Sequence, residues 1–77
     1  MRNYKIGLFG SAGVRTMEIN ENFMSDDFAL NYVERSLRYY YPVFYNAAVW
    51  RLDDEGNGTL LAEFSSAVSV TMKRKES

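Results

Sequence analysis

The side chains that could carry out chemistry in this chain are carboxylates, tyrosines, lysines, arginines and hydroxyls, because it contains neither histidine nor cysteine. Their absence excludes a structural zinc site, a histidine-activated nucleophile and a thiol redox centre. The acidic pairs Asp26–Asp27 and Asp53–Asp54 are neighbours on predicted loops, not carboxylates that converge across a pocket. We therefore expect no catalytic residues, and no enzymatic activity, in this chain.

Glycines recur at every third position in the segment 7–13, at Gly7, Gly10 and Gly13. A phosphate-cradling loop needs such glycines at the start of a helix, where backbone N–H groups point at the ligand. The residues that follow, 14–19, alternate with a period of two and so predict a strand. We interpret the glycines as a hairpin turn and expect no nucleotide or other cofactor.

An acidic turn over residues 53–58 superficially fits a calcium loop. Asp53, Glu55 and Asn57 occupy its first, third and fifth positions, but the twelfth, which should be a bidentate glutamate, is Phe64. Acidic residues and an Asn-Gly pair are also typical of an exposed tight turn. We expect a hairpin turn and no metal site.

Aromatic residues are the most unusual feature of the sequence, and three consecutive tyrosines span residues 39–41. Three consecutive helical positions cover about 300° of the circumference, so they cannot all face one sheet. Exposed tyrosine beside arginine is enriched in interface hot spots. A partly exposed edge of the core is the alternative explanation. The predicted partner-binding residues are Tyr32, Arg35, Arg38, Tyr39 and Trp50.

The first half of the chain predicts a β-hairpin followed by a helix. Alternating residues over 4–9 and 14–19 predict two strands, and residues 20–27 predict a connector. Ser25 is typical of a helix N-cap, and apolar residues at helical spacing predict a helix over 28–41 that Pro42 ends.

The second half predicts a strand over 43–52, the polar turn, a strand over 59–65 and a fifth strand over 68–73. The predicted fold is α+β, with a four- or five-stranded antiparallel sheet in chain order ββαββ(β). One amphipathic helix packs on one sheet face. The other face stays open, and a cluster of Phe9, Phe44 and Trp50 on it would favour a partner.

The composition predicts one small globular domain over residues 1–77, with a polar C-terminal end over 73–77. With 47% hydrophobic and 25% charged residues the chain can build a core, and a net charge of −1 creates no strong field for nucleic acid. The apolar stretch 6–9 is too short to span a membrane. The absence of cysteine argues against a secreted domain. We expect a cytoplasmic protein.

These observations favour a non-catalytic binding protein that occupies the surface of a protein partner. The specific form of this hypothesis is a phage or mobile-element accessory protein that inhibits a host defence complex, and it rests on size and architecture alone. The alternative is a small nucleic-acid-binding module that uses aromatic and arginine residues on a sheet face. Homo-oligomerisation is a third hypothesis and requires no foreign ligand.

Overall fold

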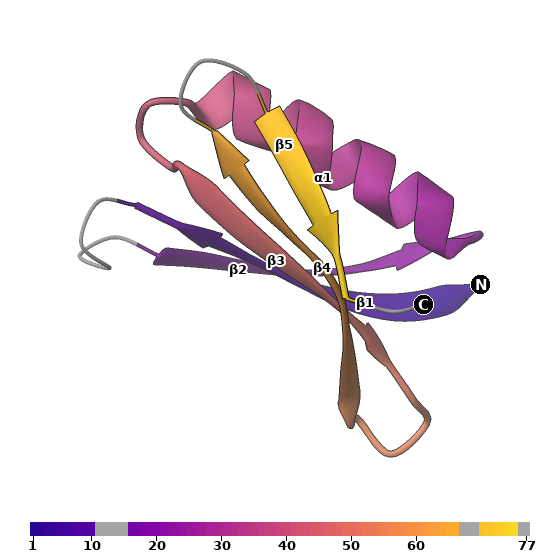
Figure 1. Ribbon diagram of the computed structural model, residues 1–77. Coiled ribbons are helices and arrows are strands. Elements are labelled where there is room, and N and C mark those ends of the chain that lie inside the picture. The colour runs from indigo at the N-terminus through magenta and orange to yellow at the C-terminus, as the bar shows by residue number, and fades with distance from the viewer. Residues whose placement is uncertain (11–15, 67–69, 76–77) are drawn as a thin grey trace.

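The computed structural model describes residues 1–10, 16–66 and 70–75 of the chain. It contains a five-stranded antiparallel sheet in the spatial order β2-β1-β3-β4-β5, with one helix across one face (Figure 1). The elements are β1 (Arg2–Phe9), β2 (Thr16–Phe23), α1 (Asp26–Tyr40), β3 (Asn46–Leu52), β4 (Gly58–Ser66) and β5 (Val70–Arg74). The predicted α+β architecture and its chain order are confirmed, with all five strands present.

Helix α1 begins and ends where the sequence places its caps. The Ser25 hydroxyl accepts a hydrogen bond from the Phe28 N–H at 3.4 Å, and the first turn carries acidic residues that complement the helix dipole. Tyr41 is already extended, and Pro42 follows it. The face of α1 that is buried on the sheet consists of Ala29, Leu30, Val33 and Leu37.

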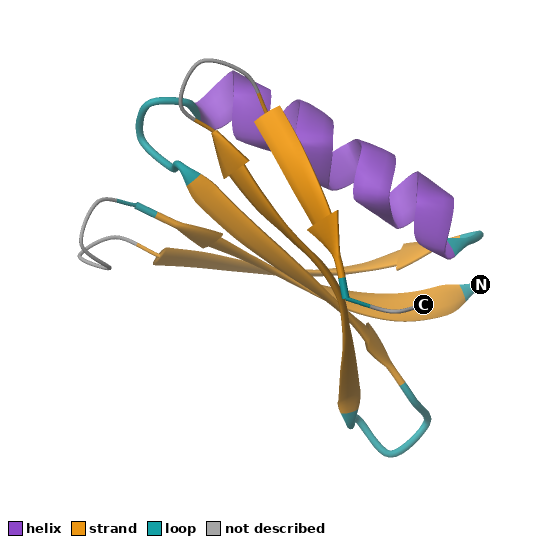
Figure 2. Ribbon diagram, in the orientation of Figure 1, coloured by secondary structure: helices purple, strands orange, loops and turns teal. Residues whose placement is uncertain are grey.

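The core lies between α1 and one face of the sheet. Figure 2 shows the helix lying along that face. Side chains alternate between the two faces of a strand, so Tyr4, Ile6 and Leu8 of β1 all point toward the helix and are fully buried. Their neighbours on β3 and β4 include Val49 and Phe64. The buried residues of this core include Ile6, Leu8, Leu30, Val33, Leu37 and Phe64.

The structure corrects the predicted connector over residues 20–27, because β2 continues through Phe23. Antiparallel pairing with β1 runs the full length of both strands, from Phe9 opposite Thr16 to Arg2 opposite Phe23. The Phe23 ring also packs on Tyr4, with ring centroids 5.7 Å apart. Pairing and packing therefore override the low strand propensity of the asparagines and glutamates in this segment.

Strand β3 begins at Asn46, later than the predicted residue 43, because the preceding residues complete the end of α1. The N–H groups of Val43 and Phe44 both donate to the carbonyl of Tyr40, at 2.7 and 3.4 Å. Tyr41 belongs to this turn and is 44% exposed, so the helix ends one residue before the predicted residue 41.

The acidic turn forms as predicted, but the glycine with the special backbone conformation is Gly56 and not the Gly58 of the Asn-Gly pair. The Asp53 carboxylate accepts hydrogen bonds from the N–H groups of Glu55 and Asn57, at 2.9 and 2.8 Å. Gly56 takes the left-handed conformation with φ 87°, which favours glycine. Gly58 is already the first residue of β4 and not part of the turn.

Candidate binding surfaces

One side of α1 presents an exposed stripe formed by Phe28, Tyr32, Arg35 and Tyr39, which we call the aromatic flank. These residues are spaced four, three and four apart, so they lie along one line of the helix. Phe28 is 58% exposed, Tyr32 39% and Tyr39 81%. A helix that packs on a single small sheet does not need these side chains for its own core.

A shallow hollow of about 290 Å³ lies at the start of the aromatic flank. It is lined by Phe23, Phe28, Asn31, Tyr32 and Arg35. The rings of Phe23 and Tyr32 lie 5.2 Å apart between centroids, so the edge strand β2 continues the apolar surface of the helix. In the part of the chain that the structure describes, Arg35 takes part in no ion pair. The hollow thus combines aromatic walls with an available guanidinium group.

The opposite, open face of the sheet carries a second aromatic group. The Phe9 ring and Trp50 both pack over Gly7, where an added Cβ would lie 2.9 Å from Phe9 Cζ and 3.4 Å from Trp50 Cζ3. The Lys5 ammonium lies 4.9 Å from the Trp50 ring centroid, within range of a cation–π contact. Phe9 and Trp50 therefore share this face, but Phe44 is buried in the core, so the three residues do not form one cluster on the open face.

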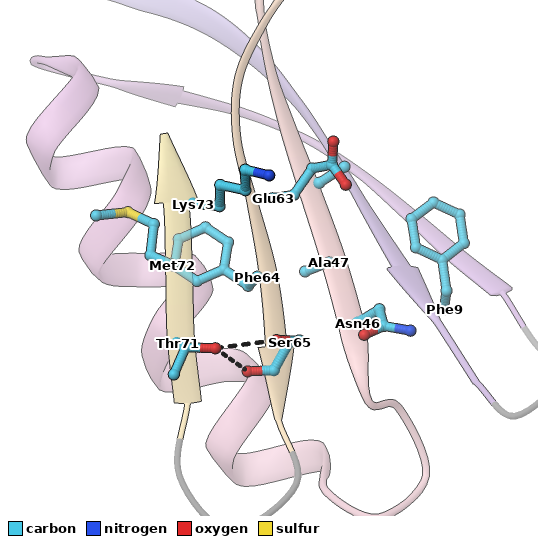
Figure 3. A pocket seen from close by; sticks show the side chains of 10 residues that line it. Phe9, Asn46, Ala47, Glu63, Phe64, Ser65, Thr71, Met72 and Lys73 are labelled. Carbon is cyan, nitrogen blue, oxygen red and sulfur yellow. Dashed lines mark hydrogen bonds between the residues drawn. The ribbon is translucent and has the colours of Figure 1, made fainter. Parts of the chain in front are cut away.

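A hollow of about 510 Å³ lies beside Phe9 on the open face (Figure 3). Its polar wall comes from β4 and β5, where the hydroxyls of Ser65 and Thr71 are 2.9 Å apart and Glu63 lies opposite Lys73. The two hydroxyls share a hydrogen bond, and Glu63 forms an ion pair with Lys75 at 3.4 Å. The hollow has mixed charge and no convergent set of donors for a particular ligand.

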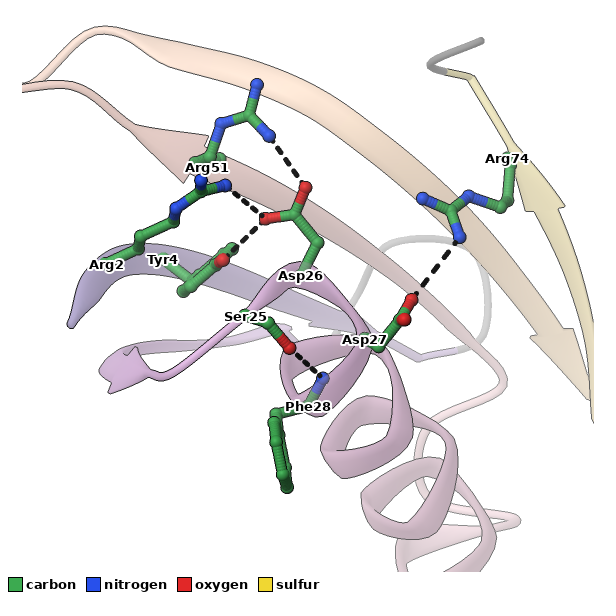
Figure 4. A network of polar contacts seen from close by, with 8 residues as sticks. All are labelled: Arg2, Tyr4, Ser25, Asp26, Asp27, Phe28, Arg51 and Arg74. Carbon is green, nitrogen blue, oxygen red and sulfur yellow. Dashed lines mark hydrogen bonds and ion pairs between the residues drawn. The ribbon is translucent and has the colours of Figure 1, made fainter.

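A network of polar contacts ties the start of α1 to the sheet (Figure 4). The Asp26 carboxylate accepts hydrogen bonds from the Tyr4 hydroxyl at 2.5 Å and from Arg51 Nη1 at 2.7 Å. Arg2 Nη1 lies 3.5 Å away and is more exposed. The neighbouring Asp27 instead pairs at the surface with Arg74, at 3.7 Å.

The two groups with shifted pKa values belong to this network. Burial raises the pKa of Tyr4 to about 12, and the hydrogen bond and negative charge of Asp26 act in the same direction. Burial also tends to raise the pKa of Asp26. The hydrogen bond from Tyr4 and the charges of Arg51 and Arg2 outweigh it, so the pKa stays below its ordinary value. Each shift is explained by a structural contact inside the fold.

The structure divides the predicted partner-binding residues between two faces. Tyr32, Arg35 and Tyr39 lie on the aromatic flank, and Arg38 lies nearby, 3.4 Å from Glu34. Trp50 lies on the opposite face of the sheet and cannot join them. Sequence reasoning missed two members of the apolar surface, Phe28 and Phe23. The spacing of Phe28 four residues before Tyr32 was the signal that could have found it.

Comparisons of the chain with models of protein families, with curated proteins and with solved structures found no match. Among the described residues, no helix is long and apolar enough to cross a membrane, and no group of three or more acidic side chains is placed to hold a metal ion. The surfaces described above are therefore the basis for a proposal of function.

Proposed function

We propose that the protein is a non-catalytic binding protein that acts inside the cell by covering part of a protein partner with its aromatic flank. The observation that carries this proposal is the alignment of exposed Phe28, Tyr32 and Tyr39 along one line of α1. Single exposed apolar residues are ordinary on any protein, but a contiguous row beside a hollow is typical of an interaction surface.

The chemistry of the aromatic flank suits protein recognition. Tyrosine contributes a large contact area with few rotatable bonds, so fixing it on binding costs little entropy. The Tyr39 ring contacts Tyr40 edge-to-face, with centroids 5.2 Å apart, which holds the exposed ring from one side. Such partly ordered aromatic residues are common among the hot spots of protein interfaces.

The partner segment should carry an apolar side chain next to a carboxylate. The apolar side chain fits the hollow between Phe23 and Phe28, and the carboxylate fits the guanidinium of Arg35. Arg38 is a weaker candidate for the same role, because Glu34 already neutralises part of its charge. We therefore place Arg35 and Tyr39 at the centre of the contact.

In the test, tagged parent and variant proteins capture the partner from a lysate of the organism that encodes the chain. The partner is identified by mass spectrometry, and its affinity for the parent and for each variant is then measured. Tyr39→Ala and Arg35→Ala should each weaken binding about tenfold or more, while the free energy of unfolding changes by less than about 1 kcal/mol. Both side chains are exposed, so their loss leaves the core intact.

Lys73→Ala is the matched control, because it truncates an exposed side chain on the open face of the sheet. It should bind like the parent. If Lys73→Ala weakens binding and the two variants of α1 do not, the binding surface is the open face and the proposal is wrong. A large loss of stability in Tyr39→Ala would show that this tyrosine belongs to the core.

The nucleic-acid alternative receives less support from the geometry. Phe9 and Trp50 do lie on the open face, but Arg51 of the same strand as Trp50 points to the helix side and binds Asp26. The ring of Trp50 has Lys5 over it, and Glu63 lies on the same open face. Salt-dependent retention on single-stranded nucleic acid, abolished by Trp50→Ala, would favour this alternative. Inhibition of a host defence complex stays a prediction until the partner is identified.

A further inference from the structure

Strand β2 is an edge of the sheet, so among the described residues one side of its backbone has no strand partner. It is eight residues long, with the sequence TMEINENF, and contains no lysine, arginine or proline. The other edge, β5, has five residues and carries Lys73 and Arg74. Positive charges and short length are the usual protection of an edge against pairing. The two edges therefore differ, and β2 is the one that can accept another strand.

We infer that β2 pairs with β2 of a second copy of this chain, antiparallel, about a twofold axis that passes through Asn20. A twofold axis perpendicular to the sheet makes two strands antiparallel and keeps their faces matched. Each residue then lies opposite one of the same parity, and one residue at the centre lies opposite its own copy. The sequence of β2 decides which residue that is.

With Asn20 at the centre, seven residues of each strand, Met17 to Phe23, are paired. On the open face, Asn20 lies opposite Asn20 of the second copy, and Glu18 lies opposite Asn22. Each side-chain amide can therefore form a hydrogen bond with the amide or carboxylate opposite it. On the helix face, Met17 lies opposite Phe23, which is an apolar pair made twice by symmetry. Ile19 opposite Glu21 is the least complementary pair of this register.

The other centres are less favourable. A centre at Glu18 or at Glu21 places that carboxylate directly opposite its own copy, and like charges in this position are destabilising. A centre at Ile19 places Met17 opposite Glu21 twice and loses the contact between Met17 and Phe23. Centres at Asn20 and at Ile19 both pair seven residues without opposed charges, and of these two only Asn20 also brings Met17 opposite Phe23.

Pairing at β2 also covers apolar surface that is only partly buried in the single chain. Met17, Ile19 and Phe23 pack against the core but are only half-buried, because β2 is the last strand on that side in the described part of the chain. A continuous sheet through two copies shields these side chains from water. Both copies of α1 then lie on the same face of the joined sheet. The inference does not rest on the proposed function, because Asn20 at the axis lies on the open face. The two surfaces share Phe23, which lines the hollow of the aromatic flank and lies opposite Met17 of the second copy.

The experiment uses charge at the centre of the axis. Asn20→Asp and Asn20→Lys each bring two like charges together, so each should weaken self-association about fivefold or more in sedimentation equilibrium. An equimolar mixture of the two variants brings opposite charges together and should restore association to the parent level or above. Asn46→Asp, an exposed substitution on the central strand β3, is the matched control and should associate like the parent.

Hydrogen exchange locates the contact independently. Alternate backbone amides of an edge strand face solvent, so those of β2 should become protected as the concentration of the parent protein rises. The inference is overturned if the parent stays monomeric up to its solubility limit, if the mixture of variants associates no better than each alone, or if Asn46→Asp weakens association equally. It is also overturned if protection appears only in α1, since the two copies would then meet through the aromatic flank.

Discussion

Asp26 offers the sharpest test of how this small domain is stabilised, since it has a matched control next to it. Both Asp26 and Asp27 lie in the first turn of α1, where a negative charge interacts favourably with the helix dipole. The Asp26 side chain is 18% exposed and the Asp27 side chain 84%. Replacing each by asparagine removes the same charge from the same turn, so the difference between the variants reports the buried network.

The expected magnitude follows from the contacts. Asp26→Asn weakens two short hydrogen bonds, from Tyr4 and from Arg51, in which the carboxylate is charged and partly shielded from water. Hydrogen bonds to charged groups contribute about 1.5–3 kcal/mol each, but asparagine keeps one acceptor oxygen. The contact with the exposed Arg2 adds little. We expect Asp26→Asn to cost about 2–3 kcal/mol at neutral pH, and Asp27→Asn less than about 0.5 kcal/mol beyond the dipole term.

The measurement is urea unfolding followed by circular dichroism, at neutral and at acid pH. For a domain of this size an m-value of about 1 kcal/mol/M converts the loss into a midpoint lower by about 2–3 M. The pKa of Asp26 is lowered in the folded state from its ordinary value of 3.8, so the native protein binds fewer protons than the unfolded chain. The contribution of the Asp26 charge to the free energy of unfolding is therefore present above pH 3.8. It is lost as the pH falls through the folded-state pKa.

Two consequences can refute this reasoning. The stability gap between the parent and Asp26→Asn should narrow as the pH falls below 3.8, whereas the gap for Asp27→Asn should stay small throughout. If Asp26→Asn and Asp27→Asn cost the same at neutral pH, the network contributes nothing beyond the helix dipole. If the gap for Asp26→Asn persists unchanged into strong acid, the loss comes from packing and not from the charge.

Three further predictions concern the core, the alkaline limit and metals. Leu37→Ala should cost about 2–4 kcal/mol, because Leu37 is fully buried under α1, and a fully folded variant with unchanged stability in urea would contradict the helix-on-sheet core. Because the pKa of Tyr4 is raised to about 12, the folded state holds this proton longer than the unfolded chain, so stability should fall between about pH 10 and 12. Tyr4→Phe should be less stable at neutral pH and lack this loss, and ultraviolet titration of the parent should show one tyrosine ionising late. Millimolar calcium should leave the melting temperature unchanged, since the Asp53 carboxylate is engaged by backbone N–H groups of its own turn. A rise of several degrees that disappears in Asp53→Asn would reveal a site.

Local signals in the sequence were sufficient for the elements whose chemistry is local. Ser25 and Pro42 bracket α1 because capping and proline sterics act within a few residues. The strand ends could not be predicted in the same way. Phe23 is in a strand because it lies opposite Arg2 and packs on Tyr4, and both partners are about twenty positions away in sequence.

The candidate surface was partly predictable for a related reason. The geometry of a helix places Tyr39 away from the buried Leu37, and the structure leaves it 81% exposed. The same reasoning could not decide that Trp50 faces the other side of the sheet. The face of the sheet to which each side chain of β3 points follows from the register of β3 with β1. That register depends on contacts between segments far apart in the sequence.

The position of β1 in the sheet has a consequence for the order of events during synthesis. β1 lies between β2 and β3, and Ile6 lies opposite Val49, so the middle of the sheet joins residues more than forty positions apart. A nascent chain can form the first hairpin and α1 early, but the apolar side of β1 has no complete cover until β3 has left the ribosome. Non-local pairing of this kind slows folding, because the intervening chain loses conformational entropy before the new contacts stabilise the fold. Ribosome-bound chains whose residues 46–52 are still inside the exit tunnel should therefore resemble a fluctuating hairpin and helix, and cooperative structure should arise only when β3 emerges.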